Sequence, residues 1–265
     1  PECNALVEGP LTAAILAVTE SYDGSSWTEV NDLNSARKLL AGAGTYTSAL
    51  AFGGRNPPSD TNRAFTEEWD GTNWTEVNDL NTARGQLAGF GATNTAAIGA
   101  GGGTPSVTAV TESWNGTSWT EVNDLNTARR NTAGAGTSTA GIVAGGEDPG
   151  RFANTETWNG TSWTEVNDLN TARNALGVAG TTTSALAFAG STPPHTAKTE
   201  SWDGTSWTEV NDMTTARSYV GSAGADNTSS LVFGGTTGSA STATEEWSAP
   251  ADFVQIQQGQ LFFNS

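Results

Sequence analysis

The segment SWTEVNDLNTAR occurs five times with few changes, and this repetition constrains the fold more than any other feature of the chain. Each copy contains an equivalent tryptophan: Trp27, Trp74, Trp119, Trp163 and Trp207. These residues are 47, 45, 44 and 44 positions apart. A nearly fixed period of this length is typical of solenoids, propellers and arrays of supersecondary units. The chain is therefore expected to form one repeat protein rather than several unrelated domains.

Each repeat divides into four strand-sized segments, as in NTARGQLAGFG, NTAAIGAGGG, VTESWNG and SWTEVNDL, bounded by Gly, Asn, Asp or Thr. Asp-Gly or Asn-Gly separates the third segment from the fourth in every copy. Such a dipeptide predicts a type I′ hairpin with two positive φ angles. Flanking aromatic residues such as Trp69 and Trp74 are then expected on adjacent strands.

Four short antiparallel strands cannot bury both faces of their sheet, but sheets packed side by side around an axis can. The first segment of each repeat is rich in Gly and Ala, which allows close approach at a narrow centre. The sequence therefore predicts an all-β fold, a single five-bladed β-propeller of four-stranded antiparallel blades, with the ring closed by an N-terminal strand.

The ends of the repeat region leave one surplus strand. The TExW/Y segment occurs six times, first at residues 20–22 and last at 245–247. We expect residues 26–33 to complete the blade begun by residues 217–247, and which of the two surplus strands pairs stays open. The predicted organisation is an N-terminal extension at 1–13, the propeller at 14–248, and a tail or linker at 249–265. Because the chain begins with Pro1 rather than Met, we expect a processed chain or part of a longer one.

An arginine follows each repeat tryptophan by ten residues, and an aliphatic run ending in Gly-Gly follows in four of the five copies. This pattern resembles the kelch repeat, although the period is shorter and the aromatic pair is mostly Trp/Trp. The resemblance implies a propeller, and kelch-like propellers include enzymes, adhesion modules and scaffolds. The C-terminal QGQLFFNS resembles segments of virion and tail-fibre proteins of tailed phages.

Composition excludes several partners. The net charge of −17 offers no basic footprint for nucleic acid. No apolar run reaches the length of about 18 residues that suggests a transmembrane helix, so no membrane span is expected. A single Cys3 rules out an intrachain disulfide.

The repeated polar residues are interpreted as structural joints, because a closed ring needs equivalent joints whereas a reaction seldom needs five equivalent sites. Arg37 is expected to meet Asp32 or a glutamate of a neighbouring blade in a half-buried ion pair. The structural set comprises Arg37, Arg84, Arg129, Arg173 and Arg217, with Trp27, Trp74, Trp119, Trp163 and Trp207. The NDLN turn offers oxygen ligands, but too few for calcium, so no metal is expected.

Catalysis is not expected either, and no cofactor is predicted. Five-bladed glycosidases place carboxylates at the axis, whereas the innermost segments here contain no Asp or Glu. A copper site or a serine triad would depend on the single His195.

The loops after the Gly doublets differ from one another, and variable loops on a rigid scaffold commonly carry binding sites. The candidate binding residues are Arg55, Arg63, Phe65, Arg151, Phe152 and His195. We expect a non-enzymatic structural or adhesion module of a virion or extracellular assembly, with other assembly proteins and possible host-surface glycans or proteins as partners. The alternatives are a purely structural spacer in a phage particle, or a cellular lectin.

Overall fold

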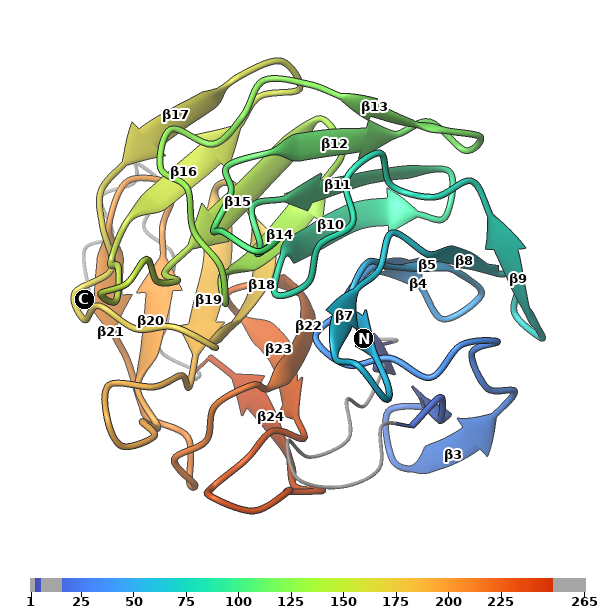
Figure 1. The fold of residues 1–265 in the computed structure, drawn as a ribbon. Helices are drawn as coiled ribbons and strands as arrows, with labels where there is room; N and C mark the ends of the chain where they lie inside the picture. Colours follow the sequence, from blue (N-terminus) through green and yellow to red (C-terminus); the bar gives the residue numbers. More distant parts are fainter. Residues whose placement is uncertain (1–2, 6–15, 250–265) are drawn as a thin grey trace, which may run out of the picture.

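The computed structural model describes residues 3–5 and 16–249, and all regular structure in these ranges is β-sheet. Figure 1 shows the sheets arranged around a central axis, with the inner strands β4, β10, β14, β18 and β22 facing that axis. The predicted all-β, five-bladed propeller is confirmed. Four blades show the full four-stranded antiparallel plan, and the fifth shows three strands among the described residues.

The strands follow the repeat in order. Blade 1 contains β4 (Ala41–Thr45), β5 (Ser48–Phe52), β8 (Thr66–Trp69) and β9 (Trp74–Val77). Blade 2 contains β10 (Ala88–Thr93), β11 (Ala96–Ala100), β12 (Thr111–Trp114) and β13 (Trp119–Glu121). Blade 3 contains β14 (Ala133–Thr137), β15 (Ala140–Ala144), β16 (Thr155–Trp158) and β17 (Trp163–Val166). Blade 4 contains β18 (Gly177–Thr181), β19 (Ser184–Phe188), β20 (Thr199–Trp202) and β21 (Trp207–Glu209). Blade 5 contains β22 (Gly221–Asp226), β23 (Ser229–Phe233) and β24 (Thr244–Ser248).

The inner strands pack closely because their side chains are small. β4 packs against β10, and the series continues through β14 and β18 to β22. A Cβ atom on Gly89 would lie 2.8 Å from the Cβ of Ala41 in the neighbouring blade. A larger side chain at that position would therefore push the two inner strands apart.

The apolar core lies between blades rather than within one sheet. Phe52 of blade 1 packs against Trp119 of blade 2, with 4.8 Å between the ring centroids. Leu50 and Phe52 are fully buried in this interface together with Leu87 of blade 2. Blades are thus stable only as neighbours, as expected for repeat proteins.

The turn between the third and fourth strands differs from the predicted type I′ hairpin. Trp69 pairs with Trp74, so four residues form the connection instead of two. Gly71 has a positive φ, but Asp70 does not. The Asp70 carboxylate instead accepts hydrogen bonds of 2.8 Å from the backbone N–H groups of Thr72 and Asn73. This side-chain acceptor, which a type I′ turn does not require, favours the longer connection.

A separate three-stranded sheet closes the ring. It consists of β1 (Cys3–Ala5), β2 (Thr19–Tyr22) and β3 (Trp27–Val30), and we call it the closing sheet. In Figure 1, β3 lies in the sector between β24 of blade 5 and β9 of blade 1. Trp27 packs on Phe233 of blade 5, and Thr19 accepts a hydrogen bond from Trp74 of blade 1.

The predicted closure by N-terminal residues is confirmed, but the predicted pairing is wrong. Residues 27–30 pair with β2 rather than with β24, so residues 26–33 do not complete blade 5. The connection at residues 23–26 is short, so pairing with β2 costs less loop-closure entropy than pairing with β24. Within the predicted N-terminal extension, residues 3–5 form β1; the rest of 1–13, and 250–265 of the tail, lie outside the described residues.

Candidate functional site

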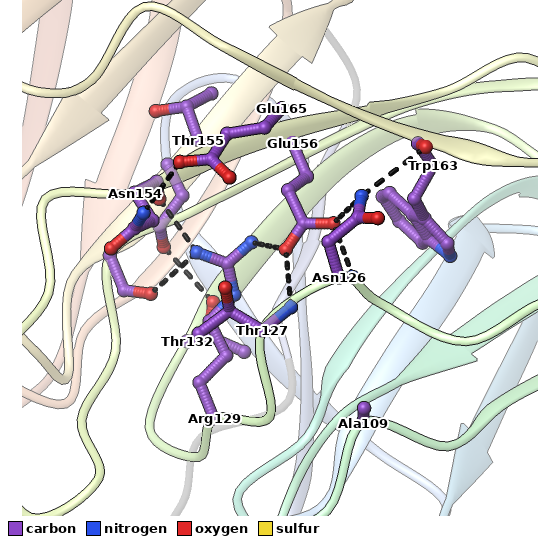
Figure 2. A network of polar contacts seen from close by, with 12 residues as sticks. Ala109, Asn126, Thr127, Arg129, Thr132, Asn154, Thr155, Glu156, Trp163 and Glu165 are labelled. Atoms are coloured by element: carbon purple, nitrogen blue, oxygen red, sulfur yellow. Dashed lines mark hydrogen bonds and ion pairs between the residues drawn. The ribbon is translucent and has the colours of Figure 1, made fainter.

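The repeat arginines lie in buried joints between blades. Figure 2 shows the joint around Arg129, whose Nη2 donates to Glu156 Oε1 at 2.7 Å. Its Nη1 donates to the carbonyl oxygen of Asn154 at 2.7 Å. The second oxygen of Glu156 accepts from the backbone N–H and the side-chain amide of Asn126, at 2.7 and 2.8 Å. One carboxylate of blade 3 therefore holds the connection between blades 2 and 3 at two points, Asn126 and Arg129.

The same pair recurs in every blade. The pairs are Arg37–Glu67, Arg84–Glu112, Arg129–Glu156, Arg173–Glu200 and Arg217–Glu245. All five arginine side chains have no exposed surface, so the pairs are buried rather than half buried as predicted. Of the two partners predicted for Arg37, the neighbouring blade's glutamate is the one found. Burial lowers the pKa of Arg37 and Arg129 from its usual value, and the paired carboxylates oppose this shift.

The repeat tryptophans form a second series of joints. The indole N–H of Trp119 donates to the hydroxyl of Thr66 in the preceding blade at 3.0 Å. The corresponding donor–acceptor pairs are Trp27–Thr244, Trp74–Thr19, Trp163–Thr111 and Trp207–Thr155. Each tryptophan–threonine hydrogen bond therefore joins two neighbouring sheets.

The candidate residues of the first variable loop lie on one short hairpin, β6 (Arg55–Asn56) and β7 (Thr61–Asn62). Arg55 donates to Asn62 at 2.9 Å and to Gln86 of the next blade at 3.2 Å. Arg63 donates to Asn56 at 2.6 Å, and its guanidinium carbon lies 5.7 Å from the ring centre of Phe65. The structure thus brings Arg63 and Phe65 together as a cation–π pair.

The candidates on the later loops also make contacts between blades. Arg151 donates from Nε to the carbonyl oxygen of Ser191 at 2.9 Å, which links the loops of blades 3 and 4. His195 Nδ1 lies 2.9 Å from the hydroxyl of Ser218 in the connection to blade 5. Phe152 is half buried, and its carbonyl oxygen accepts from the backbone N–H of Arg173. No direct contact joins Arg63 or Phe65 to Arg151 or Phe152 within the described ranges.

A ring of five residues at the mouth of the central channel was not predicted from the sequence. All five have positive φ angles between 51° and 62°: Leu39, Gln86, Asn131, Ala175 and Tyr219. The backbone N–H of each later member donates to the carbonyl oxygen of the one before it, at 2.7 to 2.9 Å. Non-glycine residues rarely adopt this conformation, and such strain is concentrated at functional sites. The sequence offers one signal for these residues, which is that the residue at this repeat position differs in all five copies.

The channel behind this mouth is a cavity of about 860 Å³. All five mouth residues line it, together with the Gly- and Ala-rich inner strands of the blades. Residues of the closing sheet, including Glu20 and Val30, line it as well. The cavity therefore extends from the mouth into the sector of the closing sheet.

Cationic side chains gather on the face that carries the variable loops and the mouth. The chain has 11 Lys and Arg residues, of which the repeat arginines account for five. Of the remaining six, five lie on the variable loops or on the connections beside the mouth, and we call this group the cationic rim: Lys38, Arg55, Arg63, Arg130 and Arg151. Lys198 directly precedes β20, at the position that Phe65 holds before β8. Three acids accompany them on the same loops, namely Asp60, Glu147 and Asp148.

The rim is held together by a polar network. Asp60 pairs with Lys38 at 3.0 Å, and Gln86 donates to Asn131 at 2.9 Å. Glu147 accepts from Asn131 at 2.9 Å and pairs with Arg130 at 3.3 Å. Arg63 and Arg151 make their side-chain hydrogen bonds to amide, carbonyl or hydroxyl oxygens rather than to carboxylates. These two guanidinium groups are therefore not neutralised by a direct carboxylate partner, on a face that also carries the turn aspartates Asp79, Asp124, Asp168 and Asp212.

Comparison with known proteins finds no family model and no curated protein that the sequence matches. Within residues 3–5 and 16–249, no three His, Cys, Asp or Glu residues are grouped as metal ligands would be. The same ranges contain no helix with the length and hydrophobicity of a transmembrane segment.

Proposed function

We propose that this protein is a non-enzymatic adhesion module of a virion or another extracellular assembly, and that its loop face binds a host-surface glycan or protein. Its repeated residues are engaged in joints, whereas the residues that vary between repeats lie around the mouth and on the loops. This division is what a rigid scaffold with a binding surface requires. The kelch-like spacing of Trp27 and Arg37 and their repeats fits such a scaffold. The phage-like QGQLFFNS segment adds support for a virion and lies outside the described residues.

The observation that carries the proposal is the placement of the cationic rim. Arginine offers planar hydrogen bonding to carboxylates and sulfates, and an adjacent aromatic ring can stack on a sugar. Arg63 with Phe65, and Arg151 with Phe152, supply both kinds of contact on one face. The acidic remainder of the chain disfavours binding to anionic surfaces elsewhere and disfavours nucleic acid.

The test is binding of multivalent particles to a glycan array, because adhesion through weak single sites depends on avidity. Particles that display the parent protein are expected to bind saturably. Particles that carry both Phe65→Ala and Phe152→Ala should lose binding while the melting temperature changes little, since both rings are only half buried. Tyr46→Ala is the matched control, because this exposed aromatic residue lies in the turn between β4 and β5, at the end of blade 1 opposite the variable loop. Equal binding by the double variant would contradict the proposed site.

A spacer function is the second candidate, and one observation favours it. Arg55, Arg151 and His195 all contact a neighbouring blade, so these loop residues also stiffen the ring. A parent particle that shows no saturable adhesion to any glycan or host cell would support the spacer.

A further inference from the structure

The closing sheet carries a sixth copy of the joint, and this copy is incomplete. Glu20 occupies the register position of the paired glutamates, since Glu20 faces Glu29 across β2 and β3 as Glu67 faces Glu76 across β8 and β9. Each of the five other glutamates pairs with an arginine and accepts from a backbone N–H of the preceding connection. Glu20 has neither contact among the described residues, and it is one of the residues that line the central cavity.

The tryptophan series is incomplete at the adjoining place. Hydroxyls of Thr19, Thr66, Thr111, Thr155 and Thr244 each accept from a repeat tryptophan. Thr199 of blade 4 is the equivalent residue, and in the described part of the chain no indole donates to it. By the pattern of the other blades, its donor would lie on the fourth strand of blade 5.

The strand arrangement in this sector shows the same two gaps. β24 pairs only with β23 among the described strands, and its Glu245 side chain is 22% exposed, against 0–2% for the other four paired glutamates. The inner strands β22 and β4 do not form the interface that joins every other pair of successive inner strands. The cavity extends into this sector, beside Glu20.

A single segment would fill both gaps. In every other repeat, the fourth strand of one blade continues through NDLNTAR into the first strand of the next, as in residues 119–137. That segment carries the tryptophan that a Thr199-type hydroxyl accepts from and the arginine that a Glu20-type carboxylate pairs with. Positions 1–2, 6–15 and 250–265 contain no Trp, Arg or Lys, so none of these positions supplies those donors.

We infer that the sector between blade 5 and the closing sheet binds a strand–turn–strand segment with the chemistry of residues 119–137, supplied from outside residues 1–265. The open edge of β24 receives the first strand of that segment by β-augmentation. The second strand enters the cavity between β22 and β4, and its preceding arginine pairs with Glu20.

The test is titration of the full chain with a fluorescent peptide of residues 119–137. Saturable 1:1 binding is expected. A peptide with Arg129→Gln should bind at least about tenfold more weakly, because a buried carboxylate loses its charged donor. A peptide with Trp119→Phe should also bind more weakly, because it lacks the indole N–H.

The matching protein variant is Glu20→Gln, which should weaken binding of the parent peptide by a similar factor. Its melting temperature should stay unchanged, since Glu20 has no arginine partner in the described structure. Glu121→Gln is the control, because this exposed glutamate holds the repeat position of Glu29 on β13 of blade 2, away from the proposed sector. Absence of peptide binding would overturn the inference. So would equal binding by the substituted peptides or by the Glu20→Gln protein.

Discussion

The buried arginine determines how one blade meets the next. Arg129 reaches one carboxylate and two carbonyl oxygens, Asn154 and Gly145, from a position without exposed surface. Such a pair costs desolvation energy, so its presence adds little net stability over an apolar replacement of both partners. Removing only one partner is different, because the remaining charge is buried without compensation.

Arg129→Ala should therefore lower the free energy of unfolding by about 3–5 kcal/mol, the range for breaking a buried ion pair. Urea denaturation of the purified protein measures this change. Arg130→Ala is a natural control one residue away, because Arg130 is 39% exposed and forms a rim pair with Glu147. Its loss should cost no more than about 1 kcal/mol. Similar losses for both variants would show that the repeat arginine is no more structural than its neighbour.

The turn between the third and fourth strands of a blade accepts either Asp or Asn at its first position. Asp23, Asp70 and Asp203 accept backbone N–H groups in their turns, and Asn115 and Asn159 do the same in blades 2 and 3. Hydrogen bonding lowers the pKa of Asp23 to about 2, with the backbone N–H of Ser26 as the largest cause. The pKa values of Asp70 and Asp203 are lowered as well, chiefly by the backbone N–H groups of Asn73 and Ser206.

These shifts predict a pH dependence with a definite sign. A carboxyl group whose pKa is lower in the folded state stabilises the fold above its unfolded pKa and loses that contribution as pH falls through the folded value. A variant carrying Asp23→Asn, Asp70→Asn and Asp203→Asn should match the parent near neutral pH. Between about pH 4 and about pH 2 its unfolding free energy should fall less than that of the parent. Asn115→Asp should have the opposite effect, and acid unfolding curves that superimpose for all three proteins would disprove this account.

The same element shows what the sequence could and could not predict. The pairing of Trp69 with Trp74 follows from aromatic residues that flank a short polar connection, and it is confirmed. The turn type was wrong because Asp70 caps the backbone with its side chain, a choice that the dipeptide alone does not reveal. The mouth residues were missed because Leu39 and Tyr219 carry no signal for positive φ, unlike glycine.

At the scale of the molecule, the period and the small inner residues predict the ring and its closure by N-terminal residues, whereas the strand pairing at the closure could not be read from the sequence. β2 and β24 have nearly the same sequence, TESY and TEEWS, so both are plausible partners for the WTEV strand. Chain connectivity decides between them, because the strand next in sequence closes the smaller loop. The candidate loop residues were found because the loops vary between repeats. Their proximity in the cationic rim could not be predicted, because it arises only when the ring places the loops side by side.

The closing sheet therefore holds the ring by side-chain packing instead of a shared ladder, and one residue carries much of this contact. Trp27 lies 5.2 Å from the ring centre of Phe233 and donates to Thr244 at 2.9 Å. Trp27→Ala should free the closing sheet and expose Phe233 beside the edge of β24, and such an edge recruits strands from other molecules. We expect dimers or larger species by size-exclusion chromatography with light scattering, together with a lower melting temperature.

Trp119→Ala is the control. It removes the equivalent contact between blades 1 and 2, which stay joined by the chain at residues 78–87. That control should lose stability through the cavity it leaves, by about 3–5 kcal/mol, yet stay monomeric below its melting temperature. A Trp27→Ala protein that elutes as a monomer and melts with the parent would show that the closing sheet is not what holds the ring shut.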